Sequence, residues 1–490
     1  MPLFGWFLGG CAMRSRFFPA GSALLVSVLL LASTPGPAVA GARSHKGGPY
    51  KVKDLRVISG PSPFAGGCPG ARFDDQAITG HELEPMITVN PANPRNIVAA
   101  WKQDVGPANQ SRSDLVASSL DGGKTWKRRT IPGLTACTGG TADAGSDPWV
   151  AAGGDGTVYF SGLAADISTD PATTAVVASR SRDGGRSWRP PATVAAPRQG
   201  NETDAIAASP RLAGHAYLAW ANFVFDLPRT NTLEFSRTTD GGRSWSPPVL
   251  VDQPGPFQID QAPRVVVLPN GTLLAVFLRV DFELELGQLY AARSLDDGRT
   301  WLPPVLAGSR PFPPPLVDPE TGIGLPQPGF PSAAVAPDGS VYVAFEASTS
   351  SSSGAVGIAR SRDGGRTWSS ADLPGVTAFA FEPAIAVDAH GTVGVTWYDL
   401  RNDRPGDAAL SADVWFAHSQ DRGRSWRQAH VAGPTDLRTA PMPAHNYVGE
   451  YQGLAGMPRG RGFAAAFTLA APQAKNGPTD IFFARIGPGR

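Results

Sequence analysis

The octapeptide Ser181-Arg-Asp-Gly-Gly-Arg-Ser-Trp188 is the strongest indication of the fold, because variants of it recur along the chain roughly every 60 residues. In the shared Asp-x-Gly core, glycine can adopt a positive φ and aspartate can accept hydrogen bonds from nearby backbone N–H groups. The motif therefore predicts a tight turn against which its tryptophan packs. The other copies span residues 119–126, 238–245, 294–301, 361–368 and 419–426.

Strand patterns flank each octapeptide. An alternating strand such as Asp413–His418 precedes it, and a short proline-rich strand such as Ser246–Val251 usually follows it. Further upstream lies a hairpin pattern, as in Glu382–Trp397, whose central turn residues are typical of hairpins. Two strands in the hairpin and two around the octapeptide make a four-stranded unit, the size of a propeller blade.

The two ends of the chain complete the repeat pattern. A seventh hairpin begins at Glu450 and has a third strand at Asp480–Arg485, but no octapeptide follows. Near the start, Val52–Ile58 reads as a strand with no blade of its own. We therefore predict an all-β fold: a seven-bladed β-propeller of four-stranded antiparallel blades, spanning residues 52–490 as a single domain. Its ring would be closed by the N-terminal strand joining the C-terminal blade, which removes two exposed sheet edges. A six-bladed ring with one irregular unit is the alternative.

Residues 1–40 are typical of a secretory signal peptide. Arg14 and Arg16 precede an apolar run from Ser22 to Ala32, and Ala38-Val-Ala40 fits a cleavage site. We expect a secreted, extracellular protein, cleaved near Ala40, with residues 41–51 as a flexible lead. Export would expose Cys68 and Cys137 to an oxidising compartment, which predicts a disulfide between them; two free buried thiols are the alternative.

The charge balance excludes two classes of partner. The chain has 43 Lys+Arg and 42 Asp+Glu, a formal net charge of +1. Proteins that bind nucleic acids or membrane surfaces need a basic face to neutralise phosphates. We therefore expect no nucleic-acid partner, no membrane association after signal cleavage, and a monomer.

The octapeptide is similar to the Asp-box, or bacterial neuraminidase (BNR) repeat, of the sialidase superfamily. The resemblance covers nearly all of the mature chain at repeat level and implies a propeller with the boxes at its periphery. It is closest to exported bacterial sialidase-like proteins of unsettled substrate, in which segments like Trp397–Asn402 and Gly449–Gly453 recur. The family's Arg-Ile-Pro signature near the first blade is absent here.

A sialidase-like active site implies three arginines that bind a substrate carboxylate, a tyrosine nucleophile assisted by a glutamate, and an aspartate acid/base. Tyr451-Gln-Gly-Leu454 resembles the family's Tyr-Ser-x-Leu around the nucleophile. The resemblance thus implies Glu450 and Tyr451 as the nucleophile machinery, with Asp147 or Glu84 as the acid/base.

The inner strands of a propeller start at one face, so their first residues should converge on one mouth. The aligned starts are Glu84, Asp147, Asp204, Gln261, Phe330, Glu382 and Glu450. Converging carboxylates repel unless they are protonated, paired with arginine or bridged by a cation. We expect no required cofactor, with Ca²⁺ a possible ligand of this acidic mouth. The alternative is a structural role, in which each acid caps exposed backbone N–H groups.

The second hairpin strands end at the same edge, which adds cationic and aromatic candidates, and Lys102 is expected there too. Two loop histidines precede the first and last inner strands. The candidate substrate-binding residues are Arg401, Arg264, Arg279, Glu382, Asp204, Tyr398, Asp399, His81 and His445.

These candidates predict a secreted sialidase-like glycoside hydrolase that acts on an extracellular glycan or glycoconjugate, with exo-α-sialidase activity as the default. A non-catalytic propeller that binds a glycan or protein through the central mouth is the alternative, and the missing Arg-Ile-Pro motif favours it. A polysaccharide lyase or esterase is a third possibility.

Overall fold

The computed structural model describes residues 48–68, 71–72, 76–106, 109–224, 230–311, 317–322, 330–347, 354–376, 379–441 and 448–489. These residues form 28 strands and the short 3-10 turns η2 (Ala136–Thr138) and η3 (Leu437–Thr439), and this part of the chain has no α-helix. The predicted all-β class is therefore confirmed. The predicted signal peptide and His445 lie outside the described residues.

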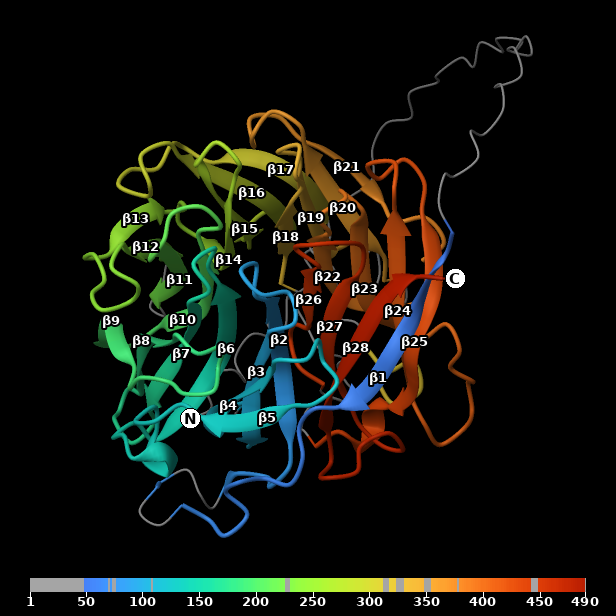
Figure 1. Ribbon diagram of the computed structural model, residues 1–490, viewed down its shortest axis with the longest axis horizontal. Helices are drawn as coiled ribbons and strands as arrows, with labels where there is room; N and C mark the ends of the chain where they lie inside the picture. Colours follow the sequence, from blue (N-terminus) through green and yellow to red (C-terminus); the bar gives the residue numbers. More distant parts are fainter. Residues whose placement is uncertain are drawn as a thin grey trace, which may run out of the picture.

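The strands form antiparallel groups of four that follow one another around a common axis (Figure 1). The first two groups join into one larger sheet through the single pair Ser111↔Gly145. From the innermost to the outermost strand, the groups are β2 (Glu82–Val89), β3 (Ile97–Val105), β4 (Ser111–Ser119) and β5 (Lys127–Thr130); β6 (Ala144–Ala152), β7 (Val158–Asp166), β8 (Thr173–Ser181) and β9 (Ala192–Arg198); β10 (Asn201–Ala208), β11 (Ala216–Val224), β12 (Thr230–Thr238) and β13 (Val249–Asp252); β14 (Gln258–Val267), β15 (Leu273–Asp281), β16 (Leu286–Ser294) and β17 (Val305–Pro311); β18 (Ser332–Val335), β19 (Val341–Glu346), β20 (Val356–Ser361) and β21 (Ser369–Asp372); β22 (Ala380–Val387), β23 (Val393–Asp399), β24 (Ser411–Ser419) and β25 (Arg427–Asp436); and β26 (Gly453–Gly456), β27 (Phe463–Leu469), β28 (Asp480–Pro488) and β1 (Tyr50–Val57).

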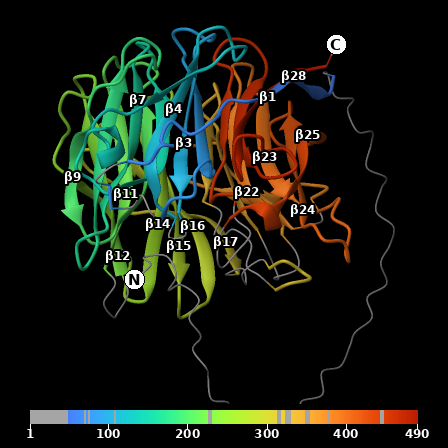
Figure 2. The same ribbon diagram turned by 90° about the horizontal axis from the view of Figure 1, so that it is seen from below.

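The N-terminal strand shares a sheet with the end of the chain, as predicted. β1 pairs antiparallel with β28, from Tyr50↔Pro488 to Val57↔Phe482 (Figure 2). The strand begins at Tyr50, so Tyr50 and Lys51 belong to the sheet and not to the expected lead. The innermost strand of this sheet, β26, contacts both β22 and β2. The first and last sheets are therefore neighbours.

The octapeptides form the turns between the third and fourth strands. In the copy at residues 181–188, Asp183 accepts hydrogen bonds from the hydroxyls of Ser181 and Ser187 at 2.8 and 2.6 Å. It also accepts bonds from the backbone N–H groups of Arg186 and Ser187 at 3.0 and 2.9 Å. An arginine before the octapeptide reaches the next sheet, where Arg180 donates to the carbonyl of Gly241 at 2.6 Å. The motif thus both closes a turn and joins neighbouring sheets.

Removing one octapeptide aspartate tests this structural role. Asp363 accepts four hydrogen bonds, from the Ser361 and Thr367 hydroxyls and from two backbone N–H groups. We expect Asp363→Ala to lower the free energy of unfolding by about 1–3 kcal/mol, because these donors lose their acceptor. Urea unfolding measures the loss, with Glu283→Ala on an exposed loop as the control. A cost no larger than that of the control would contradict the role.

The predicted disulfide is confirmed: Cys68 and Cys137 are bonded, at a sequence separation of 69 residues. A cross-link that closes so long a loop restricts the unfolded chain. We expect the double variant Cys68→Ser/Cys137→Ser to lose about 2–4 kcal/mol of stability. Denaturant unfolding of this variant beside the oxidised wild type measures the difference, and equal midpoints would refute the expectation.

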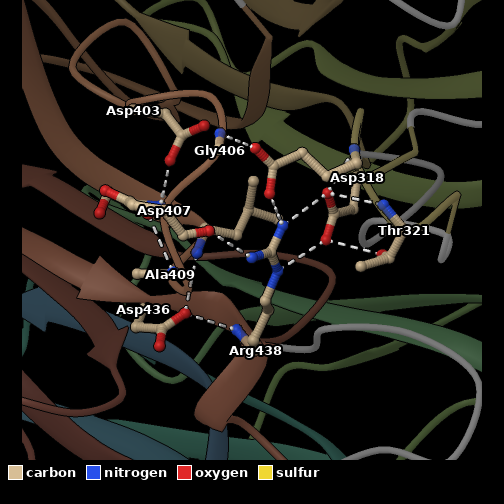
Figure 3. A network of polar contacts seen from close by, with 11 residues as sticks. Asp318, Thr321, Asp403, Gly406, Asp407, Ala409, Asp436 and Arg438 are labelled. Carbon is tan, nitrogen blue, oxygen red and sulfur yellow. Dashed lines mark hydrogen bonds and ion pairs between the residues drawn. The ribbon is translucent and has the colours of Figure 1, made fainter.

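A polar network at the periphery ties two distant segments together (Figure 3). The guanidinium of Arg438, in η3 after β25, donates to both oxygens of Asp318 at 2.8 and 3.0 Å and to Glu320 at 2.9 Å. Glu320 also accepts the backbone N–H of Gly406. The segment before β18 is therefore held against the sheet of β22–β25.

Candidate central site

The innermost strands of five sheets carry the same irregularity near their start. The register of β2 with β3 shifts between Leu83 and Met86, and Glu84 within the shift has a φ of 56°. Such a bulge turns a side chain away from the regular pleat, and a positive φ at a residue with a side chain is strained. The equivalent residues are Glu84, Asp147, Thr203, Ala262 and Glu382.

This equivalence corrects the sequence alignment of the strand starts. Asp204 and Gln261 were aligned with Glu84, but the bulge positions belong to Thr203 and Ala262. Matching the acidic or amide residues of the strands selects Asp204 and Gln261. Matching the backbone conformation selects the preceding residue in one strand and the following residue in the other. Asp204 therefore lies one residue after the bulge position, although its charge environment includes Asp147.

A buried ion cluster lies at these strand starts. The ammonium of Lys102 lies 2.7 Å from a carboxylate oxygen of Glu84 and 3.6 Å from one of Asp147, and all three side chains are buried. Burial acts to lower the pKa of Lys102, but the charges of Glu84, Asp147 and Glu450 outweigh it and raise the pKa above its ordinary value. The sequence predicts Lys102 near the acidic mouth. In the structure, its ammonium forms ion pairs with the carboxylates of Glu84 and Asp147.

Asp147 and Asp204 are neighbours in opposite environments. Asp147 accepts hydrogen bonds from the Ser146 hydroxyl at 2.7 Å and the Thr203 N–H at 3.0 Å, in addition to its ion pair. Asp204 is 2% exposed, and neither of its oxygens accepts a hydrogen bond of good geometry from the described residues. Burial raises the pKa of Asp204 well above its ordinary value, and the charge of Asp147 raises it further.

Further buried acids surround this pair. Burial, and then neighbouring carboxylates, raise the pKa of Glu202 and Glu382 well above the ordinary value. Burial also raises the pKa of Asp114, which Lys102 partly offsets. Asp114 and Glu202 are not among the residues predicted from the sequence. Asp114 lies within β4, where no repeated pattern marks it, while Glu202 lies one residue before a bulge and could have been found from that position.

An aromatic and cationic group borders the acids. The guanidinium of Arg264 lies 4.1 Å from the ring centre of Trp149 and 5.6 Å from that of Phe330. Tyr451 packs against both rings, with centroids 5.6 and 6.2 Å away. Burial lowers the pKa of Arg264 to about 10, although Tyr451 and the nearby aspartates act in the opposite direction.

The predicted nucleophile, Tyr451, lies in this group as a buried side chain. Its hydroxyl donates a long hydrogen bond of 3.5 Å to the carbonyl of Pro148. Burial raises the pKa of Tyr451 well above its ordinary value, and the charges of Glu84 and Asp147 raise it further. The environment therefore opposes formation of the phenolate.

Glu450, the other residue assigned to the nucleophile machinery, is buried at 9% exposure. Its charge acts on Lys102, Glu202 and Glu382. Glu450 thus belongs to the central acids.

Two of the predicted substrate-binding arginines are already engaged by carboxylates. Arg279 binds Asp260 through two hydrogen bonds of 2.6 and 2.7 Å and also contacts Asp252 on β13. Arg401 binds Asp399 at 2.5 to 3.0 Å and lies over the ring of Trp415. Arg264 is the predicted arginine whose electrostatic neighbours include Asp147, Asp204 and Tyr451.

Two other candidates join neighbouring sheets. The Tyr398 hydroxyl donates to the carbonyl of Thr468 at 2.8 Å and accepts the N–H of the same residue at 2.9 Å. His81 is fully buried with Nδ1 3.1 Å from the hydroxyl of Thr479, and burial lowers its pKa to about 3. The proposed pairing of His81 with His445 cannot be followed within the described residues.

No group of three or more histidine, cysteine or acidic side chains in the described residues is arranged to hold a metal ion. The calcium ion considered for the acidic mouth stays a prediction. Among the same residues, no helix has the length and hydrophobicity to cross a membrane.

Comparison with known proteins supports the resemblance found in the sequence. Residues 232–444 match the family model of the BNR repeat-like domain, which confirms the likeness to the sialidase-like BNR superfamily. A comparison with curated proteins found no match.

Several solved structures are similar to this chain at low sequence identity. A protein of unknown function from Dyadobacter fermentans is 14% identical, with 90% of this chain and 99% of that chain covered and a TM-score of 0.47. The NanB sialidase of Streptococcus pneumoniae is 11% identical, with 90% and 98% covered and a TM-score of 0.46. An α-L-arabinofuranosidase of Fusarium graminearum is 14% identical, with 70% and 93% covered and a TM-score of 0.44.

Proposed function

We propose that this chain is an exported, seven-bladed β-propeller, closed by β1, that hydrolyses glycosidic bonds of an extracellular glycan at its central site. In this proposal Asp204 is the general acid, and Asp147 is the carboxylate that acts as base or nucleophile. Glu84 and Lys102 position Asp147, while Arg264, Trp149 and Tyr451 contact the sugar. The antiparallel four-stranded groups and the contact of β26 with β2 support the ring.

The contrast between Asp147 and Asp204 carries the proposal. Most glycosidases need one carboxyl group that holds a proton and one that holds a charge, and the two are distinguished by their environments. Asp147 accepts two hydrogen bonds and pairs with Lys102, whereas Asp204 is buried beside it with a raised pKa. Asp204 would therefore carry the proton that the leaving oxygen must receive.

The pairing of the predicted arginines favours a neutral over an anionic sugar. A sialoside carboxylate needs several arginines to bind it. Of the three predicted arginines, Arg279 and Arg401 are already paired with aspartates, which leaves Arg264. The exo-α-sialidase activity inferred from the family resemblance thus becomes the less favoured form of the proposal.

The test compares two amide variants on a panel of aryl glycosides that includes sialosides. We expect Asp204→Asn to lose about a hundredfold or more in kcat/KM on substrates with poor leaving groups, and far less on dinitrophenyl glycosides, which need no acid. We expect Asp147→Asn to lose activity on both kinds of substrate, because its role does not depend on the leaving group.

Asp388→Asn is the matched control. Asp388 is also a buried carboxylate, but it binds Tyr50 and the turn between β22 and β23. Its replacement should affect stability without the dependence on leaving group. Equal losses for Asp204→Asn on both kinds of substrate would contradict the assignment of the acid.

The burial of the central acids favours one alternative, a non-catalytic propeller that binds a glycan. Glu84, Asp147 and Glu382 are each less than 10% exposed. Binding of a glycan by the wild-type protein without turnover of any glycoside in the panel would support this alternative over hydrolysis.

A further inference from the structure

A second charged region lies at the periphery, at the outer strands of the sheets. A cavity of about 330 Å³ lies between the edge formed by β8 and β9 and the octapeptide that follows β12. Three arginines line it, namely Arg180, Arg189 and Arg243, together with Ser179 and the prolines Pro190 and Pro191. The charge of a fourth arginine, Arg182, acts on the guanidinium of Arg180.

These arginines form no ion pair with a carboxylate in the described part of the chain, although the charge of Asp240 acts on Arg180. Within the described residues, no carboxylate lies at ion-pair distance from Arg180, Arg182, Arg189 or Arg243. Burial and the charges of the three neighbouring arginines lower the pKa of Arg180. The oxygens of the nearby Asp240 already accept the hydroxyl and backbone N–H of Ser244 and the N–H of Arg243.

Two of the equivalent junctions elsewhere in the ring contain an ion pair. Arg237 donates to the carbonyl of Asp297 as Arg180 does to that of Gly241, and the carboxylate of Asp297 lies 3.6 Å from its guanidinium. At the junction crossed by Arg360, Arg422 pairs with Asp338 at 3.2 Å. Within the described residues, the arginine-lined cavity has no such ion pair. Its like-charged guanidinium groups repel one another unless an anion joins them.

We propose that this cavity binds a carboxylate or sulfate group of an acidic polysaccharide, as an anchoring site separate from the central site. Guanidinium groups bind planar carboxylate and tetrahedral sulfate groups through paired hydrogen bonds. Pro190 and Pro191 offer apolar surface to a sugar ring. The small extent of the patch does not match the long basic face that nucleic acid requires. The choice of a polysaccharide as the molecule that bears the anionic group rests on the proposed function. The existence of the anion site does not depend on that function.

Calorimetric titration of the full mature protein tests the proposal with polygalacturonate, a sulfated dextran and neutral dextran as probes. We expect the wild type to bind one or both polyanions, but not neutral dextran, with an affinity that falls as salt rises. The polyanion that binds identifies whether carboxylate or sulfate is preferred. We expect Arg189→Gln/Arg243→Gln to weaken this binding by about tenfold or more. Arg180 is retained because it also joins two sheets.

The matched control is Arg366→Gln/Arg424→Gln, which removes two exposed arginines from other octapeptides. We expect the control to change the affinity by less than about twofold. Equal losses in both double variants, or no polyanion binding by the wild type, would overturn the site. Because the readout is binding, a protein without glycosidase activity still tests it, and hydrolysis of small aryl glycosides should be unchanged in Arg189→Gln/Arg243→Gln.

Discussion

Lys102→Met is expected to lower the free energy of unfolding by about 3–5 kcal/mol, the cost of leaving buried carboxylates without their cation. The ammonium is fully buried and lies 2.7 Å from Glu84 and 3.6 Å from Asp147. Methionine fills a similar volume, so the loss reflects charge more than packing. The carboxylates can respond only by taking up protons, which makes the variant least stable at alkaline pH.

A double-mutant cycle separates the ion pair from other effects of the substitution. Glu84→Gln removes one of the carboxylates that need the cation, so Lys102→Met/Glu84→Gln should cost less than the sum of the single variants. Exposed Lys124→Met is the control and should change stability by less than about 0.5 kcal/mol. Urea unfolding at pH 7 gives all four values. A cost below about 1 kcal/mol for Lys102→Met would show that the buried cation is dispensable.

The sequence could predict the fold because each repeat contains its own turn. The octapeptides mark where the third strand ends, and the strand at residues 52–58 could be placed against residues 480–485 because both lacked a partner. The start of this strand was less predictable: Tyr50 belongs to it because its hydroxyl reaches Asp388 and its ring packs on Phe416, contacts distant in sequence.

The residues of the central site could be predicted only where they occupy a position that recurs in several repeats. Glu84 and Asp147 occupy bulge positions just before a proline, a pattern visible in the sequence. Asp114 comes from the middle of β4 and has no counterpart in the pattern. Nothing in the sequence could show that Arg279 and Arg401 are bound by Asp260 and Asp399, because ion pairing depends on side-chain positions.

The same buried acids should make the protein less stable as pH rises from 6.5 to 9. A carboxyl group whose folded-state pKa exceeds its unfolded value stabilises the fold fully below the unfolded value, and this stability is lost as pH rises through the folded value. Asp114, Glu202, Asp204 and Glu382 all have strongly raised pKa values. Each pKa unit of such a shift lowers the free energy of unfolding by about 1.4 kcal/mol once the pH exceeds both the folded-state and the unfolded-state pKa.

Two other kinds of group titrate outside this range of pH. The octapeptide acids Asp296 and Asp363 have pKa values lowered to about 2, so their stabilising effect is lost only as pH falls from about 4. His81 has its pKa lowered to about 3 from the ordinary 6.5, so it opposes the carboxyl groups only below pH 6.5. Above that value the raised carboxyl groups determine the slope, and the midpoint of thermal unfolding should fall steadily.

Replacing raised acids with amides should flatten this slope. Glu202→Gln and Glu382→Gln each remove one group that must ionise in a buried position, so the midpoint should fall less between pH 6.5 and 9 than in the wild type. Glu283→Gln, an exposed acid on the loop after β15, is the matched control and should leave the slope unchanged. A wild-type midpoint that stays level or rises over this range would mean that the central carboxyl groups are already ionised in the folded protein. Asp204 would then hold no proton to donate.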